Sequence, residues 1–279
     1  MSEADAVARV HLPATVESLA AELAELGVRA GDVLLVHSSL SALGWVAGGA
    51  VAVIEALEHA LGGEGTLVMP AFSTDLSDPS RWQHPPVPRG WWPVIRDHLP
   101  AFDPRRTPTR AMGAIAELFR TLPGVLRSAH PTASFAAAGP RAAELIREHP
   151  LEDPLGEDSP LGRLHELGAR VLLLGVGHDR NTSLHLAERR AFRHLQALER
   201  TGSPLLHGGV RRWVEYQTPA VWCDDFAALG AAFEADPRRV RRGAIGAGTG
   251  RLLAQRELVA FGAEWLAQRR AADGRPAGG

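Results

Sequence analysis

The chain has 279 residues, 45% of them hydrophobic, and is therefore long enough to bury a large core. Its 30 basic and 32 acidic residues give a formal net charge of −2 and are spread along the chain, which argues against nucleic acid or a charged membrane surface as a partner. Cys223 is the only cysteine, which excludes an internal disulfide and any multi-thiolate metal site. The acidic first ten residues do not resemble a signal peptide, and no run approaches the ~18 apolar residues of a membrane span. We expect a soluble cytoplasmic protein.

Helical and extended patterns alternate over the first 72 residues. Apolar residues at helical spacing predict a helix over 16–27 that ends at Gly27, and GDVLLVHSSL, from residue 31, begins as a strand. A second helix is expected over 50–61 and a second strand over 66–72. This alternation is typical of α/β layer folds, and we predict a layered α/β/α architecture with a central mixed sheet.

Residues 73–109 interrupt this alternation. The stretch contains eight prolines and three tryptophans and has no clear periodicity. An irregular segment of this length inside a compact domain is more often functional than a plain connection. We predict that it is a long Pro/Trp-rich functional loop or lid.

Regular patterns return from residue 111. We expect a single domain over 1–270, with a disordered tail over 271–279. The elements predicted in this half are helices over 114–120, 141–149 and 161–167, strands over 134–139, 172–176 and 210–217, and helices beyond residue 181, near 224–235 and over 249–270.

The stretch LLLGVGHDRNTSLHLAE, residues 172–188, contains the densest group of reactive side chains. It begins as an apolar strand and becomes helical beyond Asn181, which is a plausible N-cap. The polar cluster therefore lies at the carboxyl end of a strand and the amino end of a helix. Open α/β sheets bind their ligands at such positions.

Two histidines and one carboxylate of this stretch are candidates for chemistry. His178 follows a glycine in a turn, from which an imidazole can reach a cleft and act as a general base. Glu188 is consistent either with orienting that histidine or with simple solvation. We interpret His185 as a packed or exposed helical residue. A metal site using Asp179 and these three residues is the alternative, but there is no HExxH motif and the histidine spacing matches no known ligand pattern, so no metal is expected.

Two further segments combine polar side chains with glycines or a turn. HSSLSALGWVAGG, residues 37–49, follows a strand and could bring its backbone close to a phosphate or a pantetheine chain, although it lacks the standard phosphate-binding glycine spacing. RSAHPTASFAAAGP, residues 127–140, joins an arginine to hydroxyls, a combination suited to a phosphate clamp. An ordinary strand-to-helix turn and a polar turn are the respective alternatives.

Acidic side chains gather in three places, where they are either solvated surface or the walls of a cleft for a polycation. The groups are Asp75 and Asp78; Glu152, Asp153, Glu157 and Asp158; and Asp224 and Asp225.

Taken in order, GDVLLVHSSLSALG, GGEGTLVMPAFS, RSAHPTASFAAAGP and EDSPLGRLHELGARVLLLGVGHDRNTSLHLAE resemble the aminoglycoside 3-N-acetyltransferases. The resemblance runs from about residue 16 to residue 195. It implies the family's own α/β fold rather than the common GNAT fold, binding of acetyl-coenzyme A, and acetylation of the 3-amino group of 2-deoxystreptamine in a polycationic aminoglycoside, an activity that confers antibiotic resistance. A monomer or a homodimer is expected.

The resemblance also implies roles for individual residues. The catalytic residues that it implies are His178 as general base and Glu188. The chemistry of a direct transfer in a ternary complex also needs oxyanion donors, for which the Thr182 hydroxyl and the backbone amides of the 38–44 loop are the candidates. The cofactor-binding residues are Ser38, Ser39, Leu43, Gly44, Thr109, Gly113, Arg127, Ser128, His130 and Ser134. The substrate-binding residues are Asp75, Asp78, Asp179, Asn181 and Asp224.

One segment departs from the family pattern. Some members carry a further acidic cluster after the strand VRRWVEYQ, whereas this chain has TPAVWCDDF, with carboxylates only at Asp224 and Asp225. The acceptor is therefore an aminoglycoside of lower charge or, alternatively, another amine in a biosynthetic pathway. Direct transfer needs no acyl-enzyme, so we expect Cys223 to be a small buried residue rather than a nucleophile.

Overall fold

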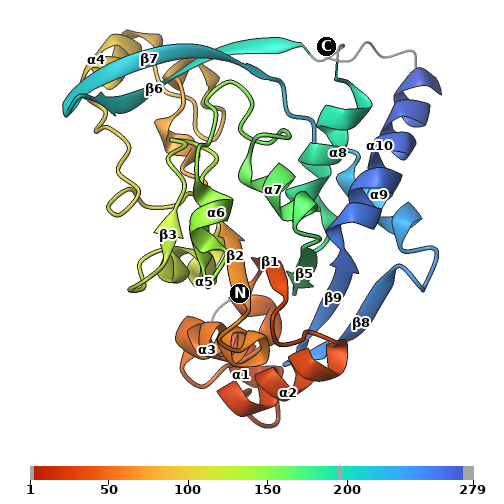
Figure 1. Cartoon of the computed structure of the whole chain (residues 1–279). Coiled ribbons are helices and arrows are strands. Elements are labelled where there is room, and N and C mark those ends of the chain that lie inside the picture. The colour runs from red at the N-terminus through yellow and green to blue at the C-terminus, as the bar shows by residue number, and fades with distance from the viewer. Residues whose placement is uncertain (1–2, 194–196, 273–279) are drawn as a thin grey trace.

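A seven-stranded sheet organises the chain, in the order β3-β4-β2-β1-β5-β9-β8 (Figure 1). The structure, a computed structural model, describes residues 3–193 and 197–272. The strands are β1 (Val33–Ser38), β2 (Thr66–Pro70), β3 (Leu126–Arg127), β4 (Phe135–Ala138), β5 (Arg170–Leu174), β6 (Leu198–His207), β7 (Val210–Pro219), β8 (Val240–Ile245) and β9 (Gly248–Ala254).

Helices cover both faces of this sheet. They are α1 (Glu3–Ala8), α2 (Val16–Leu26), α3 (Gly49–Leu61), α4 (Trp92–His98), α5 (Gly113–Phe119), α6 (Ala142–Ile146), α7 (Pro160–Glu166), α8 (Ser183–Ala191), α9 (Phe226–Phe233) and α10 (Gln255–Ala272). Of the tail expected over 271–279, residues 273–279 lie outside the described residues.

The central strands β2, β1 and β5 are parallel, and the strands on either side of them are antiparallel. In β1, Leu35 pairs with Val68 of β2 and Val171 of β5, while β4 and β9 run against β2 and β5 respectively. The sheet is therefore mixed, as predicted.

Side chains of the central strands alternate between two cores. Leu34 and Val36 pack with α2, α3 and α5 on one face, whereas Leu35 packs with the core formed by α6 to α10 on the other. All three are almost completely buried. Successive strand residues point to opposite faces, so two separate cores mean that helices cover both sides. The predicted α/β/α layering is confirmed.

Local sequence explains where the first helix begins and ends. Thr15 and Ser18 form a reciprocal capping box at the start of α2. Gly27 follows its last turn with φ +105°, the left-handed conformation in which a side chain would be strained.

The C-terminal third differs from the prediction. The helix expected over 249–270 begins only at Gln255, because residues 240–254 form the β8–β9 hairpin. Gly246, with φ +55°, lies in the tight turn of this hairpin. The hairpin continues the sheet by pairing β9 with β5, a long-range contact that local periodicity does not reveal.

The segment 73–109 contains short 3-10 turns and the helix α4. Arg211 of β7 donates to the carbonyl oxygens of Arg96 and Leu99, and the Phe102 amide donates to Pro204 O of β6 over 2.9 Å. Figure 1 shows the β6–β7 hairpin lying against α4, away from the main sheet. The segment is thus fixed to this hairpin. Within the described ranges, no helix is both long and apolar enough to cross a membrane.

Candidate active site

The reversal of strand order beside β1 places two polar loops at one edge of the sheet. From β1 the chain passes through α3 to β2 on one side, while β5 pairs with β1 on the other. The loops that follow β1 and β5 therefore flank one crevice at the carboxyl ends of parallel strands. Ligands of open α/β sheets bind at this kind of crevice.

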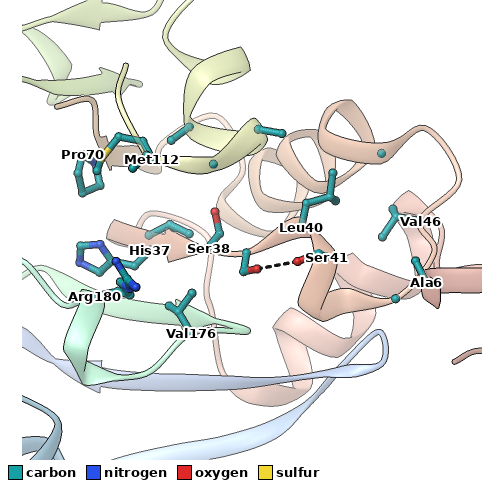
Figure 2. A pocket seen from close by; sticks show the side chains of 18 of the residues that line it. Ala6, His37, Ser38, Leu40, Ser41, Val46, Pro70, Met112, Val176 and Arg180 are labelled. Atoms are coloured by element: carbon teal, nitrogen blue, oxygen red, sulfur yellow. Dashed lines mark hydrogen bonds between the residues drawn. The ribbon is translucent and has the colours of Figure 1, made fainter. Parts of the chain in front are cut away.

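A cavity of about 840 Å³ opens at this crevice. Its walls come from β1 and the loop after it, from the start of α5 and from the loop after β5. Figure 2 shows His37 and Arg180 at one end, Ala6 and Val46 at the other, and Ser38 and Ser41 between them. The lining residues are Glu3, Ala6, Val36, His37, Ser38, Ser39, Leu40, Ser41, Gly44, Trp45, Val46, Gly49, Pro70, Ala111, Met112, Gly113, Ala114, Ala116, Val176, Arg180 and Thr182.

The loop after β1 depends on a glycine where it lines the cavity. Gly44 has φ +78°, and a Cβ on it would lie 2.7 Å from Val10 Cγ1 and 2.9 Å from the Ala247 Cβ. Both the conformation and the close approach exclude a side chain here. Beside it, the hydroxyl oxygens of Ser39 and Ser41 lie 3.2 Å apart. The wall therefore presents hydroxyls and backbone, in a mainly apolar setting.

The structure brings only part of the predicted cofactor set to this cavity. The members that line it are Ser38, Ser39, Gly44 and Gly113. The members that do not are Leu43, Thr109, Arg127, Ser128, His130 and Ser134. Leu43 is fully buried in the core, and the Thr109 hydroxyl donates to Glu117 over 2.6 Å.

Arg127 is an internal clasp rather than an open phosphate clamp. Its guanidinium donates to the Thr107 and Ala71 carbonyl oxygens, each at 2.6 Å, and to the hydroxyl oxygens of Ser134 (2.9 Å) and Ser73 (2.8 Å). Burial lowers the pKa of Arg127 to about 10. These bonds occupy the donors with which an arginine would hold a phosphate.

Ser128 and His130 lie in a second buried network beside this clasp. His130 Nδ1 accepts from the Ala133 amide over 2.9 Å, and its ring lies 4.9 Å from that of His149. His149 bridges the Ser128 hydroxyl (2.9 Å) and the Pro154 carbonyl oxygen (2.7 Å). Burial lowers the pKa of His130 to about 4 and that of His149 to about 3, so both rings are neutral.

Glu188 pairs with His185, not with His178. Its Oε2 lies 3.3 Å from His185 Nδ1 on the same face of α8, and the carboxylate is almost fully buried. The Phe226 ring packs against the imidazole at 4.8 Å. No described residue hydrogen-bonds to His185 Nε2, which leaves this nitrogen for another group. His185 is therefore a packed helical residue, as interpreted from the sequence, and its carboxylate partner is an additional feature that the sequence analysis did not predict.

His178 belongs to a different network. Its Nε2 lies 3.1 Å from Glu234 Oε1, and this carboxylate also pairs with Arg242 and Arg251. Its Nδ1 lies 3.4 Å from Asn181 Nδ2. The predicted pairing of His178 with Glu188 is therefore wrong. Burial lowers the pKa of His178, although Glu234 opposes the shift.

Asn181 links this network to the start of α8. Its Oδ1 accepts from the Ser183 amide over 3.1 Å, so its side chain caps the helix although Thr182 occupies the N-cap position. Thr182 lines the cavity, and His185 lies one turn further along. Residues three apart on a helix share a face, so His185 lies on the same side of α8 as Thr182, although neither His185 nor Glu188 lines the cavity itself.

His37 is a polar cavity residue that the sequence analysis did not single out. It is 5% exposed, and its Nε2 lies 3.4 Å from Thr182 Oγ1. The sequence signal for His37 was its position directly after the apolar run over 33–36, near the end of β1. No local sequence signal could have indicated Glu234, because it is 56 residues from its partner His178.

Most of the predicted substrate-binding side chains have partners within the chain. Arg96 holds Asp78 through bonds of 3.0 and 2.9 Å, Arg110 lies 3.4 Å from Asp75, and Arg180 lies 3.1 Å from Asp179. The fourth predicted carboxylate, Asp224, is exposed and forms no ion pair with any described residue.

Two expectations about other chemistry concern Cys223 and a metal. Cys223 is exposed, contrary to the prediction, and partial burial together with Asp224 raises the pKa of its thiol, which disfavours the reactive thiolate. Over residues 3–193 and 197–272, no three histidine, cysteine or acidic side chains converge in a way that would hold a metal ion.

Comparison with known proteins gives a consistent result. Residues 35–267 match the family model described as aminoglycoside 3-N-acetyltransferase. The chain is 45% identical over 255 residues (91% of this chain, 93% of the relative) to the prophage-derived aminoglycoside N(3')-acetyltransferase-like protein YokD of Bacillus subtilis. The crystal structure of YokD superposes with a TM-score of 0.93, covering 96% of this chain and 98% of the other.

Two further relatives extend the match to named enzymes. Aminoglycoside N(3)-acetyltransferase VIII of Streptomyces fradiae is 35% identical over 289 residues, covering 96% of this chain and 97% of the relative. The structure described as AAC-IIIb binary with CoASH has a TM-score of 0.82 and 35% identity, covering 92% of this chain and 98% of the other. With the α/β/α fold and the polar crevice beside β1, these matches establish that the chain belongs to the aminoglycoside 3-N-acetyltransferase family.

Proposed function

We propose that the protein transfers the acetyl group of acetyl-coenzyme A to the 3-amino group of the 2-deoxystreptamine ring of an aminoglycoside antibiotic. The observation that carries this proposal is the His185–Glu188 pair, one helical turn from cavity-lining Thr182. This pair supports the proposal because a histidine held by a buried carboxylate is suited to act as a base, one helical turn from a residue of the cavity wall. Family membership and a relative's structure with CoASH support the same chemistry.

The cavity suits the pantetheine part of the cosubstrate. Val36, Val46 and Met112 give it apolar walls, while Ser38 and Ser39 contribute hydroxyls. Its volume of about 840 Å³ falls within the range typical of small-molecule sites. Gly44 and Gly113 add further backbone to the cavity wall. The cosubstrate supplies an activated thioester, which accepts an amine without an acyl-enzyme.

His185 is the general base in this proposal. Glu188 accepts a hydrogen bond from Nδ1–H, which keeps the proton on Nδ1 and leaves the Nε2 lone pair for the amine. Nε2 takes a proton as the amine nitrogen bonds to the carbonyl carbon. The carbon–sulfur bond breaks, and the proton passes to the departing thiolate, which restores neutral His185. Positioning and electrostatics supply the rate, as in other direct transfers within a ternary complex.

His178 was the base expected from the sequence, and we now assign it a positioning role. Its Nε2 is engaged by Glu234 and its Nδ1 lies next to Asn181. Gly230 also lies so close that a Cβ there would be 2.2 Å from His178 Cγ. A ring enclosed in this way holds the turn before α8 against α9 and does not move protons to a substrate.

The acceptor is a polycation in this proposal, held by carboxylates beyond the His185 end of the cavity. Asp224 is the predicted carboxylate that forms no ion pair with a described residue. Asp75, Asp78 and Asp179 are each paired with an arginine, which leaves fewer carboxylates to hold a polycation. This favours a second candidate, an acetyl-coenzyme A-dependent enzyme acting on a less charged biosynthetic amine. If the acceptor is an aminoglycoside, the protein confers antibiotic resistance. It then acts in the cytoplasm, a compartment in which an exposed free thiol such as Cys223 stays reduced.

Release of coenzyme A tests the proposal. Purified protein and acetyl-coenzyme A are mixed in turn with gentamicin, tobramycin, kanamycin, neomycin and apramycin, and NMR identifies the acetylated nitrogen of each product. Thiol release that depends on an antibiotic, with acetylation at the 3-amino group, supports the proposed function. If none of the five antibiotics causes release of coenzyme A but another amine does, the second candidate is selected.

A further inference from the structure

His37 is a buried polar side chain at one end of the cavity that the proposed mechanism leaves without a role (Figure 2). It lies near the end of β1, where its backbone pairs with Leu173 of β5. Because β1 is flanked by parallel strands on both sides, the position of this side chain is fixed by the centre of the sheet. His37 is therefore held as rigidly as any residue of the cavity.

The His37 ring is neutral at every pH at which the protein is expected to work. Burial, with the positive charges that His178 and His185 can carry, lowers its pKa to about 3. A neutral imidazole has one N–H donor and one bare nitrogen. It cannot serve as the base near neutral pH, but it can donate or accept one hydrogen bond of fixed direction.

The contact between His37 and Thr182 has two possible directions. If Nε2 is bare, the Thr182 hydroxyl donates to it and has no hydrogen left for a ligand. If Nε2 carries the proton, it donates to Thr182 Oγ1, and the hydroxyl hydrogen is free. Nδ1 has no hydrogen-bond partner among the described residues, so a proton there would lack an acceptor. Buried donors without acceptors are rarer than buried acceptors without donors, which favours the Nε2–H form.

We propose that His37 is a positioning residue for acetyl transfer, whose Nε2–H donates to Thr182 Oγ1 and directs the Thr182 hydroxyl hydrogen into the cavity. This inference rests on the proposed function. The Thr182 hydroxyl then stabilises the negative charge that builds on the thioester oxygen, while His185, one turn along α8, takes the amine proton. A fixed donor directed at developing charge stabilises a transition state because it needs no reorganisation during the reaction.

A double-mutant cycle tests the proposal. Loss of an oxyanion donor typically lowers kcat by roughly 10² to 10³, so we expect Thr182→Val and His37→Leu each to lower kcat by about tenfold or more, with little change in the KM for acetyl-coenzyme A. In the Thr182→Val background, His37→Leu should have almost no further effect. Fully multiplicative losses, or a change confined to KM, would overturn the proposal.

A conservative variant separates positioning from packing. The amide nitrogen of glutamine reaches about as far as imidazole Nε2, so His37→Gln should recover much of the rate. His37→Asn, whose amide is shorter, should resemble His37→Leu, with thermal unfolding confirming that each variant is folded. The acid limb of the pH–rate profile should stay in place in His37→Gln, because His37 takes up no proton in the reaction. Recovery by neither amide, or loss of that limb, would contradict the assignment.

Nitrogen-15 NMR of the histidine rings in the free protein gives a readout that does not depend on turnover. We expect the Nε2–H form of His37 in the wild type. A bare Nε2 would overturn this inference whether or not any antibiotic is acetylated. Absence of acetylation with Nε2–H present would instead count against the proposed function, so the two failures are distinguishable.

Discussion

Glu188 Oε2 lies 3.3 Å from His185 Nδ1, three residues away on one face of α8, and the carboxylate is only 1% exposed. In the other histidine of the same stretch, His178, Nε2 lies 3.1 Å from Glu234 Oε1. The two histidines of this stretch therefore have different carboxylate partners, one local in sequence and one brought from 56 residues away. In His178 both ring nitrogens have a neighbour, whereas in His185 only Nδ1 has one among the described residues. This difference is the basis for proposing His185 rather than His178 as the base.

The first prediction concerns Arg127. Replacing it with methionine removes every bond of the clasp, including the 2.6 Å bonds to the Thr107 and Ala71 carbonyl oxygens, and puts an apolar side chain among the polar groups that it joined. We expect the free energy of unfolding to fall by about 3 kcal/mol, measured by urea titration. Arg141→Met, at an exposed ion pair, is the matched control and should cost less than roughly 1 kcal/mol. Unchanged stability with much weaker coenzyme A binding would restore the phosphate-clamp interpretation.

The second prediction is a loss of stability in mild acid. Burial lowers the folded-state pKa of His37 and His149 to about 3 and that of His130 to about 4, below the unfolded value near 6.5. As pH falls below 6.5, the unfolded chain binds protons that the folded protein does not, so the stability present at higher pH is progressively lost. Each histidine contributes up to about 1.4 kcal/mol per pH unit over this window.

Urea titrations at about pH 7.5, 6 and 5 measure this loss, and the unfolding free energy should decrease at each step. His149→Gln provides an internal control, because it removes one of the three groups and should make the decrease less steep. An unfolding free energy that is constant between the highest and the lowest pH would show that these rings are not held neutral.

The third prediction concerns the contact between α9 and His178. Glycine to alanine in a helix normally stabilises by up to about 1 kcal/mol. At Gly230 we expect the opposite, because the new Cβ would meet the buried imidazole at 2.2 Å and overpacking costs roughly 1–3 kcal/mol. Gly63→Ala, where nothing lies within 4 Å, is the control and should change stability little. Thermal unfolding of both variants decides the sign, and a stabilised Gly230→Ala would refute the tight packing.

The sequence was sufficient for the layers of the fold and for the edge of the sheet at which the cavity opens. The alternation of helix and strand over the first 72 residues, and the glycine at the end of α2, are local signals that the structure bears out. The carboxyl ends of β1 and β5 were predicted as ligand positions from the loops that follow them. The cavity lies at that edge of the sheet.

The partners of the polar side chains were not predictable in the same way. Nothing local distinguishes His178 from His185, since the choice depends on Glu234, which the fold brings from the end of α9. Arg127 is suited to a phosphate clamp by type, but its donors are taken by carbonyl oxygens up to 56 residues away. The β8–β9 hairpin was missed for a related reason, because its pairing with β5 is non-local.

The most direct test compares two matched variants, His185→Gln and His178→Gln. Each replaces an imidazole by an amide that can still donate a hydrogen bond but cannot take a proton from the substrate amine. With an accepted aminoglycoside, His185→Gln should lower kcat by roughly 10²-fold or more, while His178→Gln, still able to donate to Glu234, should stay within about tenfold of the wild type. A large loss for His178→Gln, with His185→Gln close to wild type, would contradict the assignment of His185 as the base.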